Sequence, residues 1–267
     1  MPPIPRRLAC SETWASNQRT ASLVELPGLT ACVFGAGGAR SRWRRCSLSG
    51  RLPSCIVSRM ALAGVSGHGQ TVAVFGERLR ELMPRYLLDL EQIALLRDLN
   101  QVVRAELGGG HYATMVAVGF HGRRGLAVMT NAGHPPPLWH RASRGEWSWL
   151  ETNRDSQREQ PVGLPLGLFD DITYDRLVLK PRAGDFLLLF SDGVCESKSP
   201  AGIELARDGQ IDMVRTLDSS APESLGTQLA SALCAFRGNT EPVDDEYLTV
   251  LSRSSVEEKQ PKRRLVQ

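Results

Sequence analysis

The amino-acid sequence predicts an α+β fold built from antiparallel strands and a small number of grouped helices. Apolar stretches of strand length come in pairs that are separated by short polar turns, as in β-hairpins. Helical periodicity is confined to a few segments that stand apart from these pairs. The strands therefore do not alternate with helices in the way that a parallel α/β sheet requires.

Residues 56–65 predict the first well-marked strand, which ends at the glycine-rich turn 66–69. Residues 70–83 predict a helix, because apolar side chains recur on one face of it. These side chains are Val72, Phe75, Leu79 and Leu82. A second helical pattern spans residues 86–107 and ends at the glycine run 108–110.

Three pairs of strands follow, each joined by a turn that contains Gly. The pairs are 111–120 with 125–130, 138–141 with 147–150, and 172–179 with 185–190. Between the second and third pairs, the polar residues 153–160 predict a loop. A helix is expected over residues 222–237, and the last strand over residues 247–252.

The chain of 267 residues is 42% hydrophobic, which suffices for a sizeable core in one large domain. No apolar run reaches the ~18 residues that span a bilayer. The N-terminus lacks the apolar core and cleavage site of a signal peptide. A cytoplasmic protein without membrane contact is therefore expected. The six cysteines include no C-x-x-C spacing, so a zinc site is not expected.

The charge is unevenly spread along the chain. Residues 1–60 contain nine Arg and no Lys against two acidic residues, which leaves +7 there, whereas the whole chain carries +3. We expect residues 1–55 to form a poorly ordered Arg-rich segment. Residues 56–253 then form the folded domain, and the charged tail 254–267 is expected to be disordered. A basic arm can also bind nucleic acid, but a poorly ordered segment is the favoured interpretation.

Acidic residues stand at the ends of two predicted strands. Asp192 follows an apolar run that begins after Asp185, and it precedes a glycine. Asp244 and Asp245 precede the last predicted strand. Carboxylates held at strand ends suit hard cations such as Mg²⁺ or Mn²⁺, which prefer oxygen ligands. The first hypothesis is therefore metal-assisted phosphoryl chemistry, in which the metal activates water.

Residues 131–137 read Asn-Ala-Gly-His-Pro-Pro-Pro and predict an unusual turn. Gly133 permits a tight bend, and the prolines stiffen its exit. His134 is a candidate base or metal ligand. No other His or Cys stands nearby with ligand spacing, so a structural histidine that ties the turn to a neighbour is the favoured interpretation.

Residues 64–68 read Gly-Val-Ser-Gly-His. A serine between a strand and a helix is typical of a nucleophile elbow, but the G-x-S-x-G pattern fails at His68. A serine hydrolase that uses Ser66 and His134 remains an alternative. The favoured interpretation is a glycine turn that opens a helix, whose free N–H groups suit phosphate.

Several strings in a fixed order make the chain resemble one known family. They are Val65-Ser-Gly-His-Gly69, Tyr112-Ala-Thr-Met115, Asn131-Ala-Gly-His-Pro-Pro-Pro137, Leu164-Pro-Leu-Gly-Leu-Phe169, Gly184-Asp-Phe-Leu-Leu-Leu-Phe-Ser-Asp-Gly-Val194 and Asp244-Asp245. From about residue 56 to residue 253, the chain resembles the PPM (protein phosphatase 2C-like) superfamily, in its bacterial SpoIIE/RsbU-type branch. No single string is specific for this superfamily, whereas the whole set in this order is.

The resemblance implies a PPM-type sandwich of two antiparallel β-sheets flanked by α-helices, with the N-terminal part of the fold degenerate. It implies hydrolysis of phosphoserine or phosphothreonine on a regulatory protein, such as an anti-anti-sigma factor. Two Mn²⁺ or Mg²⁺ ions would hold the attacking hydroxide. Asp192 and Asp244 would match metal ligands, with Asp245 and the Val65 carbonyl as further candidates. The supporting turns would contain Ser66, Gly67, His68, Gly69, Asn131, His134 and Gly193.

The chain departs from the family where the first metal ligands belong. The family's string is Asp-Val-Ser-Gly-His-Gly, whose Asp bridges both metals, and this chain has Gly64 at that position. The family's upstream Gly-Gly-Asp-x-x-Asp motif has no counterpart, because no Asp or Glu occurs from Leu26 to Gly76. At most one metal ion is therefore expected to bind well.

Two explanations of the missing carboxylates are open. Either the chain is a degenerate phosphatase, or residues 1–55 come from a shifted reading frame or a wrong start, which their Arg, Ser, Cys and Trp bias suits. An impaired metal-dependent phosphatase is preferred to the alternative, a non-catalytic pseudophosphatase that binds a regulatory protein. The sequence predicts neither the substrate protein nor the oligomeric state.

Overall fold

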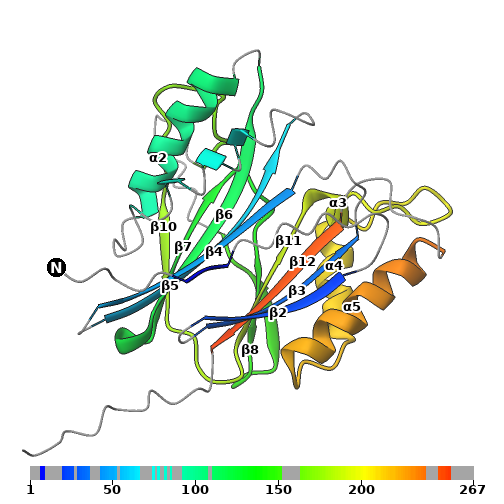
Figure 1. The fold of residues 1–267 in the computed structure, drawn as a ribbon. Coiled ribbons are helices and arrows are strands. Elements are labelled where there is room, and N and C mark those ends of the chain that lie inside the picture. The colour runs from blue at the N-terminus through cyan, green and yellow to red at the C-terminus, as the bar shows by residue number, and fades with distance from the viewer. Residues whose placement is uncertain are drawn as a thin grey trace, which may run out of the picture.

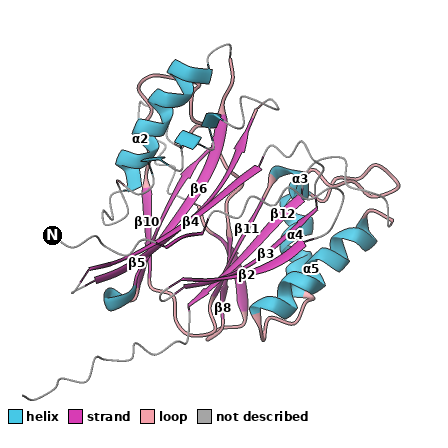
Figure 2. Ribbon diagram, viewed as in Figure 1, coloured by secondary structure: helices cyan, strands magenta, loops and turns pink. Residues whose placement is uncertain are grey.

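Two antiparallel sheets of six strands each form the described part of the chain (Figures 1 and 2). The first sheet contains, in spatial order, β1 (Arg7–Ala9), β4 (Trp43–Leu52), β5 (Cys55–Val65), β6 (Ala113–His121), β7 (Leu126–Ala132) and β10 (Arg176–Leu179). The second contains β2 (Thr20–Leu26), β3 (Leu29–Ala36), β12 (Glu246–Arg253), β11 (Phe186–Phe190), β8 (Leu138–Arg141) and β9 (Glu146–Trp149). The computed structural model describes residues 7–9, 20–26, 29–36, 43–52, 55–66, 74–75, 77–78, 81–82, 85, 92–107, 110–151, 163–238 and 246–253.

The helices lie on the outer faces of the two sheets (Figure 1). On the first sheet packs α2 (Gln92–Val102), which continues into the π-helical turn η1 (Val103–Leu107). On the second sheet pack α4 (Ala206–Arg215) and α5 (Pro222–Phe236). The short helix α3 (Asp192–Cys195) directly follows β11, and the turn η2 (Gly122–Arg124) connects β6 to β7.

The core between the two sheets consists of side chains that alternate along their strands. Met60 and Leu62 of β5 point into it from the first sheet. Leu187 and Leu189 of β11 point into it from the second sheet. Its other buried members are Val116, Val118, Phe120, Ala127, Met129, Leu150, Leu179 and Leu251. The alternation determines which face each further position of β5 and β11 presents.

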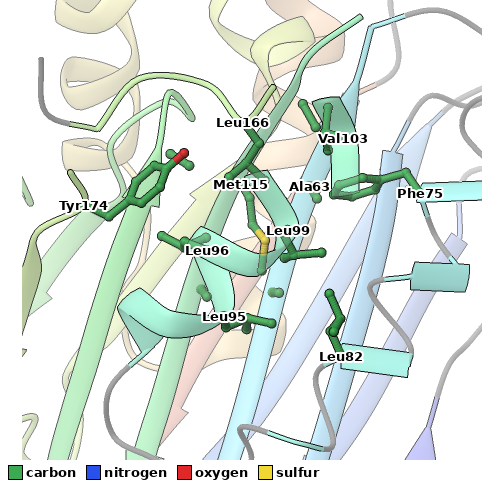
Figure 3. Packing of buried hydrophobic residues seen from close by; sticks show 14 of the residues in the cluster. Ala63, Phe75, Leu82, Leu95, Leu96, Leu99, Val103, Met115, Leu166 and Tyr174 are labelled. Atoms are coloured by element: carbon green, nitrogen blue, oxygen red, sulfur yellow. The ribbon is translucent and has the colours of Figure 1, made fainter. Parts of the chain in front are cut away.

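A second core lies beneath α2, on the outer face of the first sheet (Figure 3). Leu95, Leu96 and Leu99 of α2 are completely buried in it. Burial of one such side chain contributes about 1.5–3 kcal/mol. Phe75 and Leu82, which the sequence placed on one face of a helix, are buried in the same core. The other two residues of the predicted face, Val72 and Leu79, lie outside the described residues.

A third core joins the outer face of the second sheet to α4 and α5. Leu225, Leu229 and Leu233 of α5 recur at a spacing of four residues and are buried in it. The sheet contributes Leu138, Phe186, Leu188, Phe190, Leu248 and Val250. Both faces of β11 are therefore covered, which explains why this strand reads as an unbroken apolar run.

The predicted α+β class, with two antiparallel sheets flanked by helices, is confirmed. The predicted pair 111–120 and 125–130 corresponds to the neighbouring strands β6 and β7. The predicted strand 172–179 was too long, because only Arg176–Leu179 form the strand β10, and the preceding Ile172 and Tyr174 are buried in the core beneath α2. Helix α4 was not predicted, since its buried positions include the polar Gln210.

The segment 1–55, which the sequence led us to expect as poorly ordered, contains four strands in the structure. In the second sheet β3 lies between β2 and β12, and in the first sheet β4 pairs with β5. Leu29 pairs with Arg253 and Ala36 pairs with Glu246. β2 pairs with β3 and β4 with β5 as neighbours along the chain, and β3 also has a distant partner, β12. These strands were not predicted, because residues 1–55 show no sustained apolar alternation. The domain boundary near residue 55 stays a prediction.

Some predicted features lie outside the described residues. They are the helix residues around 70–73, the loop 153–160, the turn residues Gly67, His68 and Gly69, the pair Asp244–Asp245 and the tail 254–267. Where the structure describes the chain, no helix is both long and apolar enough to cross a membrane.

Candidate functional site

The strand β11 ends at a buried Ser-Asp junction. Its five residues are buried, Ser191 is completely buried, and Asp192 opens α3 with partial exposure. The Oδ1 of Asp192 accepts a hydrogen bond of 2.8 Å from the N–H of Gly193. The structure therefore presents the Asp192 carboxylate at the end of a buried strand, beside a glycine.

The start of β12 lies directly beside this junction. The N–H of Ser191 donates a hydrogen bond of 2.9 Å to the carbonyl of Tyr247. In return, the N–H of Tyr247 donates to the Oγ of Ser191 over 2.9 Å. Asp244 and Asp245 precede β12 in the sequence, and their placement lies outside the described residues. Their predicted convergence with Asp192 stays a prediction.

Gly64 faces the core between the sheets. Met60 and Leu62 point into that core, and side chains alternate along β5, so position 64 belongs to the same face. Gly64 pairs with Thr114 on β6. A side chain at position 64 would therefore point between the two sheets, at the end of β5.

The ring of His134 connects the two sheets. Its Nδ1 lies 3.4 Å from the Oγ1 of Thr114, which belongs to the first sheet. The ring also interacts with the backbone of Phe190, which belongs to the second sheet. Because Thr114 pairs with Gly64 and Phe190 precedes the Ser-Asp junction, the glycine and the junction lie at the same end of the core.

Asn131 holds the turn that carries His134. Its Nδ2 donates to the carbonyl of His134 over 2.9 Å, and its Oδ1 accepts from the N–H of His134 over 2.8 Å. Gly133 has a φ of +66°, and a Cβ there would lie 2.4 Å from the Cγ of Pro165. The turn geometry thus accounts for the asparagine and the glycine, and it favours the structural interpretation of His134.

Burial lowers the pKa of His134 from 6.5 to about 3, because the charged ring would lose its hydration. The ring is neutral near pH 7, and such a weak base contributes little to general-base catalysis. The Oγ of Ser66 instead accepts the N–H of Tyr112 over 2.8 Å. The N–H of Ser66 donates to the carbonyl of Tyr112 over 2.9 Å. These contacts give Ser66 a structural role and do not support the serine-hydrolase alternative.

Beside the junction lies a buried ionic cluster that was not predicted from the sequence. Arg237 and Glu246 are 5% and 6% exposed, and the Nη1 of Arg237 lies 2.6 Å from the Oε2 of Glu246. The Oγ of Ser197 donates to the Glu246 carboxylate and also lies 3.0 Å from the carbonyl of Gly193. An acidic run is visible in the sequence, but no local pattern indicates a buried arginine as its partner.

Asp185, at the start of β11, has a different role. Its Oδ1 accepts the N–H of Ala142 over 3.0 Å, and its Oδ2 accepts the N–H of Arg182 over 2.9 Å. The Asp185 carboxylate thus caps turns at the opposite end of the strand from Asp192. Asp185 does not join the candidate site. The five residues of β11, each of which advances the strand by ~3.3 Å, lie between the Asp185 and Asp192 carboxylates.

A site for a divalent cation needs several oxygen ligands. Within the described ranges, no group of three or more His, Cys, Asp and Glu side chains is placed to hold a metal ion. Asp192 is the described carboxylate at the Ser-Asp junction, and Gly64 supplies none. The described donors do not fit a two-metal centre. Asp244, Asp245 and the Val65 carbonyl stay predicted ligands, and the two aspartates lie outside the described residues.

Comparison with known proteins gives the family of this chain. The family model of stage II sporulation protein E (SpoIIE) matches residues 58–254, which is most of the chain. The chain belongs to the SpoIIE family. The matched range includes Gly64, the His134 turn and Asp192. The predicted resemblance to the SpoIIE/RsbU-type branch of the PPM superfamily is thereby confirmed.

Known relatives agree with the assignment to the SpoIIE family. Phosphoserine phosphatase RsbU of Bacillus subtilis (strain 168) is 26% identical over 167 residues, which cover 61% of this chain and 47% of RsbU. The SiaA-PP2C domain of Pseudomonas aeruginosa has a TM-score of 0.63 at 15% identity, covering 88% of this chain and 85% of that domain. RsbX in complex with magnesium has a TM-score of 0.61 at 13% identity, covering 88% of this chain and 100% of RsbX. The two structures show a shared fold, and the chain spans about half the length of RsbU.

Proposed function

We propose that the chain is a metal-dependent protein serine/threonine phosphatase of the SpoIIE/RsbU type. One observation carries the proposal: the His134 turn brings the position of the missing family ligand, Gly64, to the same end of the core as Asp192. RsbU is a phosphoserine phosphatase, and the similar RsbX structure is a complex with magnesium. The membership of the SpoIIE family supports the same reaction for this chain.

Asp192 and Asp244 would hold one Mn²⁺ or Mg²⁺ ion, with Asp245 and the Val65 carbonyl as further donors. When bound, such an ion would acidify a water molecule, so that a nucleophilic hydroxide exists near neutral pH. Carboxylate and carbonyl oxygens are the donors that these hard cations prefer. No side chain of the chain itself needs to attack the phosphoryl group in this proposal.

The other residues at this end of the core would position the donors. Ser191 and Tyr247 hold the ends of β11 and β12 together by two reciprocal hydrogen bonds. The neutral ring of His134 links Thr114 of the first sheet to the second sheet. The proposed role of His134 is to keep the two sheets in place while it neither gives nor takes a proton.

The phosphatase activity of this chain is proposed to be impaired. A two-metal centre holds its cations about 3.5–4 Å apart, and carboxylates must offset their mutual repulsion. Gly64 faces the core where the family's bridging carboxylate belongs, and it provides no charge. One ion bound mainly by Asp192 and Asp244 would leave the water less acidic and less well oriented.

The proposed substrate is a phosphorylated regulatory protein of the cytoplasm, such as an anti-anti-sigma factor. The support comes from the SpoIIE family and from the similarity to RsbU. A phosphoserine peptide is the simplest probe of this substrate class, because it carries the reacting group without the docking surface of the protein.

Hydrolysis of a phosphoserine peptide in the presence of Mn²⁺ tests the proposal. We expect slow, Mn²⁺-dependent release of phosphate, with a kcat below the ~1 s⁻¹ at the lower end of ordinary enzymes. The variant Asp192→Asn should lose this activity, whereas Asp208→Asn, an exposed position on α4, should retain it. Metal-independent hydrolysis, or full activity of Asp192→Asn, would refute the proposed site.

Gly64 also favours a second candidate function, a non-catalytic pseudophosphatase that binds a regulatory protein. The two candidates differ in how they respond to metal. A pseudophosphatase would bind its partner with the same affinity with and without Mn²⁺, and it would release no phosphate. The proposed phosphatase would release phosphate in proportion to the occupancy of the metal site.

A further inference from the structure

Three exposed apolar side chains lie together at one place on the surface. Among the described residues, five large apolar side chains are exposed, and they include Tyr112 at 41%, Leu168 at 40% and Phe169 at 52%. The backbones of Ala113 and Leu166 are hydrogen-bonded in both directions, over 2.9 and 2.7 Å. These two segments run antiparallel, so Tyr112 stands opposite the residue that precedes Leu168. We call the side chains of Tyr112, Leu168 and Phe169 the apolar patch.

The backbone beneath the apolar patch is fixed by α2 and η1. The carbonyl of Phe169 accepts a hydrogen bond of 2.9 Å from the Nδ2 of Asn100, a side chain that is 2% exposed. The Oδ1 of Asn100 accepts the N–H of Gly167 over 2.7 Å. The carbonyl of Leu168 accepts a hydrogen bond of 3.3 Å from the Nη1 of Arg104. Because these contacts turn the carbonyl groups inward, the side chains of Leu168 and Phe169 are held at the surface in a fixed arrangement.

The apolar patch adjoins the candidate site. The Oγ of Ser66 accepts the N–H of Tyr112, and the N–H of Ser66 donates to the carbonyl of Tyr112. Ser66 follows the end of β5, two residues after Gly64. Two residues after Tyr112, the side chain of Thr114 contacts the ring of His134. A phosphorylated residue bound at this end of the core would therefore have the apolar patch as its neighbour.

The size of the apolar patch favours a short peptide segment as its occupant. An aromatic side chain buries about 150–250 Å² when it is fully covered, so three side chains that are about half exposed offer about 300 Å² at most. Each partner of a stable protein pair buries ~800 Å². A second copy of the chain would need a much larger surface, whereas a single apolar side chain of a bound segment would cover the apolar patch.

We propose that the apolar patch binds an apolar side chain of the phosphorylated regulatory protein, close in sequence to its phosphoserine. This inference rests on the proposed function for the class of the partner, and it needs no bound cation. Aromatic and aliphatic anchors supply much of the affinity in protein recognition, and a few polar groups fix the orientation. The apolar patch therefore selects among phosphoserine segments by the side chain that stands near the phosphoserine.

Peptides that carry a phosphonate analogue of phosphoserine test the proposal, because the analogue is not hydrolysed. Each peptide has a polar background and one leucine at a different distance from the phosphonate, and a reference peptide has no leucine. Binding to the full chain is followed by fluorescence anisotropy, with Mn²⁺ and without it. We expect at least one leucine position to raise the affinity by about 5-fold or more, and the variants Leu168→Ser and Phe169→Ser each to remove most of this gain.

The chain offers matched controls for these variants. Val178→Ser on β10 and Ile203→Ser remove apolar side chains that are 52% and 66% exposed, at least as much as those of the apolar patch. Both variants should keep the preference for leucine. Phe169→Leu, which retains an apolar side chain, should keep most of it. Thermal unfolding checks that every variant folds, and because the changed side chains are exposed, we expect similar midpoints.

The outcomes separate the apolar patch from the proposed function. The absence of a leucine preference at every position overturns the proposal, and so does an equal loss of that preference in Val178→Ser and Ile203→Ser. A dimer that Phe169→Ser dissociates, measured by analytical ultracentrifugation, makes a second copy the occupant and also overturns it. A leucine preference without release of phosphate from ordinary phosphoserine peptides refutes the phosphatase and leaves the apolar patch as a binding surface. Release of phosphate without a leucine preference does the reverse.

Discussion

The N–H of Tyr247 donates a hydrogen bond of 2.9 Å to the side-chain oxygen of Ser191. The N–H of Ser191 returns a hydrogen bond of 2.9 Å to the carbonyl of Tyr247. These bonds continue the pairing of β11 with β12 up to the residue before Asp192. The end of one central strand and the start of its neighbour are therefore held in a fixed relation.

We predict that the carboxylates of Asp192 and Asp244 converge to less than about 8 Å, because ligand oxygens on one Mg²⁺ each lie ~2.1 Å from it. The variant Asp192→Asn should weaken Mn²⁺ binding by more than 10-fold, about 1.4 kcal/mol. Asp185→Asn, at the other end of β11, is the matched control and should leave the affinity unchanged. Equal effects of the two changes, measured by titration calorimetry, would contradict the site assignment.

Gly64→Asp should restore part of the missing activity. The new carboxylate would point into the core between the sheets and add a ligand at the family's bridging position. Gly64→Asn, which has the same shape without the charge, should restore none. We expect Gly64→Asp to raise Mn²⁺-dependent peptide hydrolysis by about 10- to 100-fold, and only partly, because the upstream acidic motif is also absent. A rate equal to that of Gly64→Asn would show that the missing charge is not the limiting defect.

The buried His134 should make the protein less stable in mild acid. Its pKa is lowered from 6.5 to about 3 in the folded state, so below pH 6.5 the unfolded chain binds a proton that the folded chain does not. This contribution to stability is complete above pH 6.5 and is lost as the pH falls toward 3. The slope is at most about 1.4 kcal/mol per pH unit.

Denaturant unfolding at pH 7.0, 6.0 and 5.0 measures this effect, with His134→Gln as the reference. The unfolding free energy of the unvaried chain should fall more steeply than that of His134→Gln. His140 also has a pKa lowered by burial, and its contribution is common to both proteins and cancels in the difference. Parallel curves for the two proteins would mean that the His134 ring titrates normally in the fold.

Two glycines with similar backbone angles should respond differently to a methyl group. Gly133 and Gly125 have φ values of +66° and +58°. A Cβ at Gly133 would lie 2.4 Å from Pro165, whereas a Cβ at Gly125 meets nothing within 4 Å. We expect Gly125→Ala to cost about 1 kcal/mol of stability through backbone strain, and Gly133→Ala to cost about 3 kcal/mol. Equal midpoints of urea unfolding would contradict the close approach.

The strands of the segment 1–55 lead to a prediction about proteolysis. Because β3 pairs along its whole length with β12, and β4 with β5, cleavage within these strands requires the sheets to open. We expect limited trypsin treatment to leave a stable fragment that still contains residues 29–52. A resistant fragment that begins near Cys55 would instead support the poorly ordered segment that the sequence indicates.

The central part of the fold could be predicted from the sequence, because local patterns determine it. The unbroken apolar run Phe186–Phe190 predicts a strand that is buried on both faces. The spacing of Leu95 and Leu99 predicts one buried face of a helix. The turn at His134 was predictable, since its glycine and prolines restrict the backbone. These features depend on residues that are neighbours in the sequence.

The remaining features depend on contacts that no local sequence pattern indicates. The sequence around Thr20–Ala36 has small and β-branched residues but no clear alternation; β2 pairs with β3, and β3 in turn pairs with β12. The ion pair of Arg237 with Glu246 likewise joins the end of a helix to the start of a strand. A charged residue in a sequence reads as exposed until its partner is known, so local analysis could not place either side chain in the interior.

The position of β12 has a consequence for how the protein is made. This strand lies in the middle of the second sheet, between β3 and β11, although it comes last among the described strands. A ribosome needs about 10–40 s to add the residues from 37 to 245 at ordinary rates of synthesis. During this time β3 lacks its neighbour β12, and β11 lacks it from the moment that residues 186–190 have been made, so each of these strands presents an unpaired edge to other chains. The nascent protein is therefore exposed to aggregation until its last strand emerges, and a chaperone that covers strand edges should raise its yield.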